Sequence, residues 1–359
     1  MMISTKSKTP LERRDLKGLT HEELADFVCG LGEPPYRAAQ IFAWLYDKNV
    51  DCVDAMTNLS KTLRDRLRQS ARVSRLKLVT KQESAKDGSV KYLFELEDGQ
   101  AIESVLMFED KRKTLCVSTQ VGCAIDCKFC ATGMMGFKRN LTVAEIVEQL
   151  LRVQHLTGHK ITNMVFMGMG EPFQNYRNVM TACKILCHET GQNMAQKQIV
   201  VSTSGILPKI YQFADEGHKY RLAISLNATT DRLRNSLMPL NRRWPLAKLM
   251  QAAKYYTSRS KERVTFEYVL LQGKNDSTAD ARRLKKLTSG IACKINLIPY
   301  NTTVGTFQRT SKEQILFFYE ALSDLDVPVM IRWSKGDDIA AGCGQLAVTE
   351  RQVEATSLP

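Results

Sequence analysis

Three cysteines stand close together in the first half of the chain, with the spacing C-x3-C-x2-C. They are Cys123, Cys127 and Cys130, in the segment CAIDCKFC. Thiolates in so short a loop can bind one metal centre. A structural zinc site normally has four protein ligands, and only His155 and His159 are near enough in sequence to supply another. A 4Fe-4S cluster held by three cysteines leaves one iron open to a small chelating ligand, so the residues favour a cluster over zinc.

The composition is that of an ordinary globular protein. The chain has 359 residues, 43% hydrophobic and 25% charged. Ten cysteines are too few for a disulfide scaffold at this length, so we interpret them as metal ligands, catalytic thiols or small buried residues. No apolar run reaches the ~18 residues of a membrane span. The opening segment lacks the apolar core of a signal peptide and carries Glu12 and Asp15. We therefore expect a cytoplasmic protein that does not enter a membrane.

The charge balance favours a polyanionic partner. Lys and Arg number 51 against 38 Asp and Glu, a formal net charge of +13. Residues 61–81 hold eight of the basic residues and one acid, Asp65, while Leu63 and Leu67 could keep one helix face packed. A solvated amphipathic helix explains the same run. Further candidates for contacts with nucleic-acid phosphates are Lys138-Arg139, Arg242-Arg243 and Arg282-Arg283.

Apolar runs alternate with helix-length segments from Leu115 onward. The runs are 115–118, 163–168, 199–203, 222–226, 264–271 and 294–298. This alternation predicts an α/β fold with a parallel sheet and crossover helices. Six units fall short of the eight that close a full barrel, so we expect a partial (β/α)6 barrel with its site at the carboxyl ends of the strands. A doubly wound open sheet is the alternative, and residues 328–333 could add a seventh strand.

The preceding residues predict smaller units. Thr20 and Glu23 form the pattern of a capping box, and 36–46 carries apolar residues at helical spacing. Runs at 90–96 and 101–108, separated by Asp98-Gly99, predict a β-hairpin. We expect four parts, which are a small basic helical domain (1–80), a linker hairpin carrying Glu103 (81–114), the barrel (115–346) and a C-terminal tail (347–359).

The ordered motifs resemble one enzyme family. C-x3-C-x2-C with Phe before the last Cys is the signature of the radical S-adenosylmethionine (SAM) enzymes. The segments LCVSTQVGCAIDCKFCATGMMGFKRNLT, FMGMGEPFQNY, VSTSGILP, ISLNATTDRLRNSLMPLNRRWPL, LIPYN and GCGQL, over roughly residues 15–346, are similar to the 23S ribosomal RNA adenine carbon-2 methyltransferases of the RlmN type. The segment PPYRAAQIFAWLYDKNV resembles the small RNA-binding domain of that family.

The resemblance implies the cofactors and the residues that bind them. One 4Fe-4S cluster is expected on Cys123, Cys127 and Cys130, with SAM on its open iron. The expected SAM contacts are Gly170, Glu171, Ser202, Ser225, Leu226, Asn227 and Asn301. Considered without the resemblance, these residues are turns and strand-end caps. Well-known members carry His where this chain has Asn227, which keeps a hydrogen-bond donor and acceptor but loses the titratable ring.

Carbon 2 of adenine is electron-poor, so methylation there by polar displacement does not work, whereas a carbon radical can add. The resemblance implies that a first SAM methylates Cys343 and that a radical from a second SAM activates this methyl group. It also implies that Cys116 later forms a disulfide with Cys343, and that Glu103 removes the ring proton. Taken singly, the two thiols are more typical of inert buried cysteines, and Glu103 of an outward-facing strand residue.

These features predict an enzyme that methylates 23S ribosomal RNA and also transfer RNA, with an electron donor such as flavodoxin or ferredoxin. The nearest alternative is the Cfr type, which methylates carbon 8 of the same adenosine; the GMGEP segment with Pro172 and the N-terminal segment favour carbon 2. A glycyl-radical activase would share the cluster but would not need Cys116 and Cys343. The non-enzyme alternative is an RNA-binding protein stabilised by zinc or by a cluster.

Overall fold

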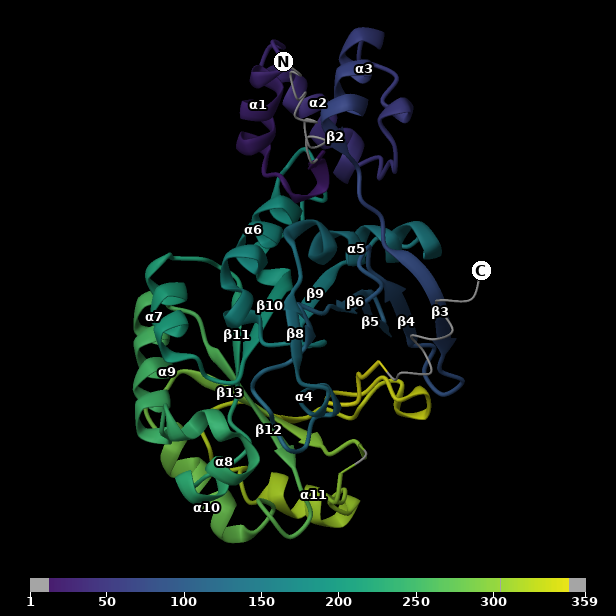
Figure 1. Ribbon diagram of the computed structural model, residues 1–359. Helices are drawn as coiled ribbons and strands as arrows, with labels where there is room; N and C mark the ends of the chain where they lie inside the picture. Colours follow the sequence, from purple (N-terminus) through teal and green to yellow (C-terminus); the bar gives the residue numbers. More distant parts are fainter. Residues whose placement is uncertain (1–12, 304, 349–359) are drawn as a thin grey trace, which may run out of the picture.

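A curved ten-stranded sheet forms the centre of the computed structural model, which describes residues 13–303 and 305–348 (Figure 1). Across the sheet the strands are β14 (Val329–Ile331), β13 (Cys293–Pro299), β12 (Val264–Leu270), β11 (Arg221–Ser225), β10 (Ile199–Thr203), β9 (Asn163–Phe166), β6 (Arg112–Cys116), β5 (Ala101–Glu109), β4 (Val90–Glu95) and β3 (Lys77–Glu83). The strands from β14 to β6 pair in parallel, which confirms the predicted partial barrel and adds the seventh strand. Strands β5, β4 and β3 continue the sheet in antiparallel pairs.

Helices connect the parallel strands. They are α4 (Ala131–Met134), α5 (Val143–Thr157), α6 (Tyr176–Cys187), α7 (Leu207–Asp215), α8 (Asp231–Leu237), α9 (Leu246–Ser260), α10 (Thr278–Thr288) and α11 (Lys312–Glu320). Figure 1 shows α7 and α9 along the outer side of the sheet. Parallel strands need such crossovers, and the apolar faces of the helices cover the strands. Within the described residues, no helix is long and apolar enough to cross a membrane.

Local signals fix the ends of α5, the long helix that follows α4 and the strand over Phe137–Asn140. The Thr142 hydroxyl accepts from Glu145 N at 3.2 Å, and the Glu145 carboxylate accepts from Thr142 N at 2.8 Å. This capping box satisfies two backbone donors that the first helical turn leaves unpaired. The helix ends at Gly158, whose φ of 67° is easily adopted only without a side chain. The start of the helix is therefore fixed just beyond that strand.

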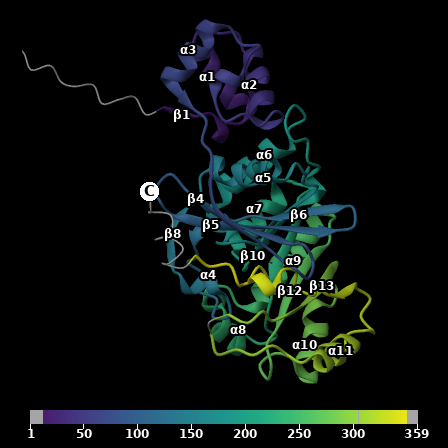
Figure 2. The ribbon, with the colours of Figure 1, turned by 90° about the vertical axis from the view of Figure 1, so that its right-hand side faces the viewer.

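Three N-terminal helices pack at one end of the barrel, as both ribbon views show (Figures 1 and 2). They are α1 (His21–Gly30), α2 (Tyr36–Tyr46) and α3 (Lys61–Ser70), and the short strands β1 (Arg14–Asp15) and β2 (Ala71–Arg72) pair beside them. The predicted capping box of Thr20 and Glu23 and the predicted helix over 36–46 are confirmed. A buried ion pair of 2.5 Å between Lys17 and Glu148 joins this part to α5.

Two predictions about the segment before the barrel were wrong. The basic run 61–81 is not one helix, because α3 ends at Ser70 and the chain continues through β2 into β3. The hairpin is also more than a linker, because β5 pairs with β6 and makes the hairpin part of the barrel sheet. Its Asp98-Gly99 turn does lie between β4 and β5 as predicted. The expected tail 347–359 lies almost wholly outside the described residues.

Candidate active site

The cysteine loop lies between β7 (Gln120–Gly122) and α4, above the carboxyl ends of the barrel strands. Strand β8 (Phe137–Asn140) returns antiparallel to β7, and Cys123 N donates to Gly136 O at 3.0 Å, so the loop is closed at its base. The thiols of Cys123, Cys127 and Cys130 all line one pocket. The loop therefore presents three soft ligands to a common space, as the sequence predicts.

The donor set fits a cluster better than a single zinc ion. Among the described residues, no three side chains of the His, Cys, Asp or Glu type lie close enough to bind one metal ion. A cubane needs no such convergence, because each cysteine binds a different iron. His155 and His159, the candidate additional zinc ligands, are exposed at the far end of α5 and do not line the pocket.

The pocket collects most of the predicted SAM contacts at the ends of successive strands. Its lining includes Gly170, Glu171, Ser202, Ser225 and Asn227 together with the three cysteines. Parallel strands bring their carboxyl ends to one face, which is why residues so far apart in sequence meet there. The pocket thus lies where the alternating sequence pattern places it.

Gly170 and Glu171 are held tightly against β7. Gly170 has a φ of 99°, and a Cβ there would lie 2.6 Å from the Gln120 side chain, so no larger residue fits. The buried Glu171 carboxylate accepts from Ser204 N at 2.7 Å and Phe173 N at 3.0 Å. Burial raises the pKa of Glu171, and these backbone donors oppose that shift. The result is a fixed acceptor beside the cysteine loop.

The other predicted SAM contacts divide into two groups. Ser225 and Asn227 line the pocket, but Leu226 does not, since its side chain points into the core. Asn227 takes a φ of 55°, which Asn tolerates better than most residues, and its Oδ1 accepts from Val269 N at 2.9 Å. Asn301 lies beside the pocket, and its buried Oδ1 has no hydrogen-bond partner among the residues that the structure describes.

Residues 336–347, which we call the strap, carry Cys343 to the pocket. Figures 1 and 2 show this yellow segment close to α4. Cys343 O accepts from Asn301 Nδ2 at 3.1 Å, and a Cβ on Gly342 would lie 2.6 Å from the same Nδ2. The Cys343 side chain is open to the pocket, although protein surrounds it. Burial and the nearby carboxylate of Glu267 raise the pKa of Cys343 to about 12.

Cys116 lies at the end of β6 and is buried beside the pocket. Burial raises the pKa of its thiol, and the charge of Cys343 adds to that shift, so the two sulfur atoms lie within electrostatic reach of each other. Both are free thiols. The structure therefore brings together two cysteines that are far apart in the sequence.

Glu103 is placed behind the strap rather than in the pocket. Its side chain is 1% exposed, Lys91 Nζ lies 3.3 Å from Oε1, and Oε2 accepts from Ala347 N at 3.0 Å. Burial raises the pKa of Glu103, and the Lys91 charge opposes this. A strand carboxylate was expected to face outward unless it had a special role, and this one faces inward.

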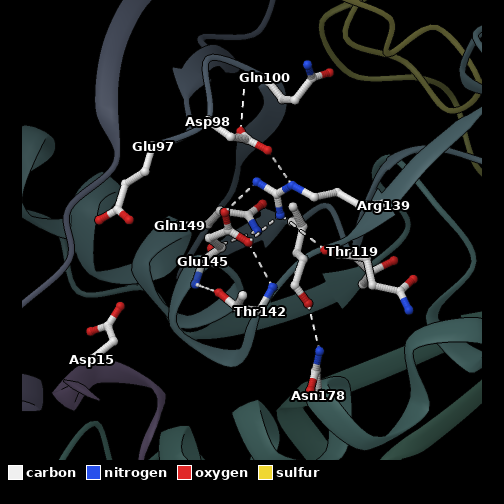
Figure 3. A network of polar contacts seen from close by, with 12 residues as sticks. Asp15, Glu97, Asp98, Gln100, Thr119, Arg139, Thr142, Glu145, Gln149 and Asn178 are labelled. Carbon is white, nitrogen blue, oxygen red and sulfur yellow. Dashed lines mark hydrogen bonds and ion pairs between the residues drawn. The ribbon is translucent and has the colours of Figure 1, made fainter. Parts of the chain in front are cut away.

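Several predicted phosphate contacts are instead occupied within the protein. Figure 3 shows Arg139 between Asp98 and Glu145, with hydrogen bonds of 2.6 Å to the first and 2.8 and 2.9 Å to the second. Arg139 is thus paired within the protein, which makes it a weaker candidate for an RNA contact. Internal partners also engage Arg68, Arg72, Arg75 and Arg283. Exposed candidates without a carboxylate partner among the described residues are Lys61, Lys81, Lys138, Arg242, Arg243 and Arg282.

Comparison with known proteins decides the family. The profile of the ribosomal RNA large subunit methyltransferase N-terminal domain matches residues 14–73, and that of the radical SAM superfamily matches residues 117–284. A probable dual-specificity RNA methyltransferase RlmN from Staphylococcus carnosus is 44% identical over 98% of this chain and 100% of its own. The chain belongs to the RlmN family. The RlmN relative from Halalkalibacterium halodurans is 47% identical over 94% of each chain.

A solved structure of a radical SAM methyltransferase agrees with the fold. The crystal structure of a radical SAM methyltransferase from Sphaerobacter thermophilus superposes with a TM-score of 0.89, at 47% identity, over 93% of this chain and 99% of that one. Membership of the RlmN family makes the chain a SAM-dependent radical methyltransferase with a 4Fe-4S cluster. The resemblance and the fold class predicted from the sequence are confirmed.

Two charged residues at this RlmN-family site were not predicted. Glu267 on β12 lines the pocket, and burial raises its pKa to about 7, partly offset by a 2.9 Å hydrogen bond from Asn296 Nδ2. Arg234 on α8 is buried behind the strand ends. Glu267 could have been suspected as a charge inside the apolar run VTFEYVLL, whereas no local pattern marks Arg234.

Proposed function

We propose that this protein methylates carbon 2 of an adenosine in 23S ribosomal RNA, and of an adenosine in some transfer RNAs. The observation that carries the proposal is that Cys343 lines the pocket of the three cluster cysteines, within electrostatic reach of the buried Cys116. A radical enzyme without a methyl carrier has no use for two further thiols there. The printed names of the relatives, which describe dual-specificity RNA methyltransferases, support an RNA substrate.

The residues at the pocket have different roles in the proposed reaction. When bound, the cluster supplies an electron that cleaves SAM and yields a 5′-deoxyadenosyl radical. Gly170, Glu171, Ser202, Ser225 and Asn227 would hold SAM in the pocket, with Leu226 contributing to the position of its two neighbours and Asn301 offering its unpaired Oδ1. Three cysteines would leave one iron of the cluster open to SAM, and the pocket that they line also contains the polar residues expected to bind SAM.

Cys343 carries the methyl group in this proposal. A first SAM methylates its sulfur, and a second SAM provides the radical that removes a hydrogen atom from that methyl group, so each methylation consumes two SAM. The resulting carbon radical adds to the electron-poor carbon 2. The open side of Cys343 faces the pocket, which supports a role in which SAM reaches this sulfur.

Cys116 and Glu103 complete the reaction. Glu103 takes the ring proton from the adduct, and the raised pKa that burial gives its carboxyl makes it a stronger base than an exposed carboxylate. In this structure Ala347 N–H covers one carboxylate oxygen, so that contact must open before Glu103 reaches the substrate. Cys116 then attacks the sulfur of Cys343, so that the carbon–sulfur bond breaks as the disulfide forms. The released carbon takes a proton to become the methyl group, and the unpaired electron of the adduct would return to the oxidised cluster.

The substrate adenine must leave its stack to reach Cys343, so the RNA should present a flipped or unstacked base. We propose that the helical domain over 1–80 and the exposed cations Lys61, Lys81, Lys138, Arg242, Arg243 and Arg282 contact RNA phosphates. The reductant is a small electron carrier such as flavodoxin or ferredoxin. An RNA substrate and such a carrier both belong to the cytoplasm.

Nucleoside mass spectrometry tests the proposal. The anaerobically reconstituted enzyme, SAM and a strong reductant are incubated with 23S ribosomal RNA fragments or with transfer RNA, and the digests are compared with standards for adenosine methylated at carbon 2 and at carbon 8. We expect the carbon-2 product from both RNAs. A carbon-8 product would instead establish the Cfr-type activity, and release of 5′-deoxyadenosine without any methylated nucleoside would refute both.

A further inference from the structure

Arg234 is a buried cation with no acidic partner at ion-pair distance among the described residues. Only 1% of the residue is exposed. Its Nε donates to Leu226 O at 3.0 Å, its Nη1 donates to Asn241 Oδ1 at 3.0 Å, and its Nη2 donates to Ser204 O at 2.7 Å and to Ser225 O at 3.0 Å. Buried charges are normally paired, because leaving water is costly for them. Its hydrogen bonds all go to neutral acceptors, and the carboxylate of Asp231 is linked to it only through Asn241, which bonds to both.

The helix that carries this cation touches the cysteine loop. Lys128 N donates to Leu237 O at 2.9 Å, at the end of α8. Leu237 also belongs to the small apolar cluster that contains Phe129 and against which Cys127 packs. Burial lowers the pKa of Arg234 to about 10, and the charge of Cys127 opposes that shift, so the guanidinium stays protonated at neutral pH. The cation therefore lies within electrostatic reach of the thiolates.

The same side chain also holds two walls of the pocket. Ser204 and Ser225 both line it, at the ends of β10 and β11, and Arg234 binds both of their carbonyls through one nitrogen. A planar guanidinium fixes the angle between its donors, whereas an ammonium group does not. Its geometry thus sets the separation of two strand ends where SAM is expected.

We propose that Arg234 is a positioning residue with two separable effects, in which its buried charge favours reduction of the cluster and its fork of donors fixes the strand ends that bind SAM. The inference rests on the cluster that membership of the RlmN family implies, and not on the RNA substrate. Reduction adds an electron to a centre already surrounded by thiolates. A fixed cation in a medium of low dielectric stabilises the more negative form and raises the reduction potential.

Two substitutions separate charge from geometry. Arg234→Gln removes the charge. Arg234→Lys keeps the charge but loses the planar guanidinium and its several donor groups. The control is Arg232→Gln, an exposed residue of the same helix, which changes the net charge by the same amount. The measurements are the midpoint potential of the cluster, by redox titration with electron paramagnetic resonance in the absence of RNA, and the dissociation constant of SAM on the anaerobic holoenzyme.

We expect Arg234→Gln to lower the midpoint potential, and both Arg232→Gln and Arg234→Lys to leave it unchanged. Both Arg234 variants should bind SAM about tenfold more weakly, because hydrogen bonds from a charged donor to the strand ends are lost. An unchanged potential in Arg234→Gln overturns the electrostatic effect. If Arg234→Gln does not retain its cluster, the test rests on Arg234→Lys alone. A shifted midpoint potential or a wild-type affinity for SAM in Arg234→Lys would contradict the proposal.

Discussion

Ala131 and Gly344 are joined by a backbone hydrogen bond of 2.7 Å, from Ala131 N to Gly344 O. Each is the immediate neighbour of a cysteine that lines the pocket, Cys130 in the loop and Cys343 in the strap. The Thr132 hydroxyl reinforces the contact by donating to Leu346 O at 2.5 Å. The position of Cys343 is therefore set by the same loop that carries the third predicted cluster ligand.

Cys343→Ala should abolish RNA methylation while SAM cleavage persists. The radical source remains, but the carbon that would carry the methyl group is missing. The measurement is mass spectrometry of methylated nucleosides and of 5′-deoxyadenosine from the same anaerobic reaction. Cys29→Ala, which removes an exposed thiol far from the pocket, is the matched control. Methylation by the Cys343 variant at the control level would remove this thiol from the mechanism.

Cys116→Ala should accumulate protein covalently joined to RNA. Addition of the carbon radical can proceed, but no thiol attacks Cys343 to release the product. Denaturing gel electrophoresis under turnover conditions detects the adduct as a band containing both protein and RNA. Cys293→Ala, another buried thiol in the sheet, should give no such band. Normal turnover without an adduct in the Cys116 variant would show that release follows another route.

Gly342→Ala should impair methylation by displacing the strap. The added Cβ would lie 2.6 Å from Asn301 Nδ2, and that side chain also holds the Cys343 carbonyl. Such overpacking costs about 1–3 kcal/mol, and here we expect it as a local shift with lost product and nearly normal thermal stability. Gly30→Ala, which meets nothing within 4 Å, is the control. Wild-type rates in Gly342→Ala would mean that the strap tolerates movement.

Glu267→Gln should stabilise the fold at alkaline pH and not at acidic pH. Burial raises the pKa of Glu267 to about 7, so the folded protein keeps its proton where the unfolded chain has lost it. The stabilisation from this proton is complete below the unfolded pKa and is lost as the pH rises through 7. Above pH 7, the free energy of unfolding of the variant should exceed that of the wild-type protein by at most about 3 kcal/mol. Urea unfolding of the wild-type protein and of the variant at pH 5 and pH 8 measures the difference between their free energies of unfolding. An equal difference at the two pH values would refute the raised pKa of Glu267.

Much of the barrel could be predicted because its strands are locally marked. Each parallel strand is a continuous apolar run, as expected when helices cover one face and side chains fill the other. The basic run over 61–81 failed for the opposite reason. Its cations are compatible with helix or strand, and the switch at Ser70 depends on the pairing of β3 with β4, which no local pattern reveals.

The residues of the candidate site show the same contrast between local sequence patterns and long-range contacts. Cys123, Cys127 and Cys130 are close in sequence, so their spacing was sufficient to predict a metal centre. The approach of Cys343 to Cys116 depends on the strap and on β6, and only the family resemblance pointed to it. Arg234 was missed because the carbonyls that it binds lie at the ends of two other strands. The pairing of Arg139 could not be predicted because it includes Asp98, 41 residues earlier in the chain.

The fastening of the strap determines the order in which the protein can be assembled. Asp338 accepts from the Ser84 hydroxyl at 2.7 Å, while Gly336 N donates to Asp87 at 2.9 Å, so the strap docks on the turn between β3 and β4. Ribosomes make every strand of the sheet before this segment. A nascent chain can thus form its barrel while the strap does not yet cover the pocket. Iron and sulfide can reach the three cysteines most easily before the strap docks.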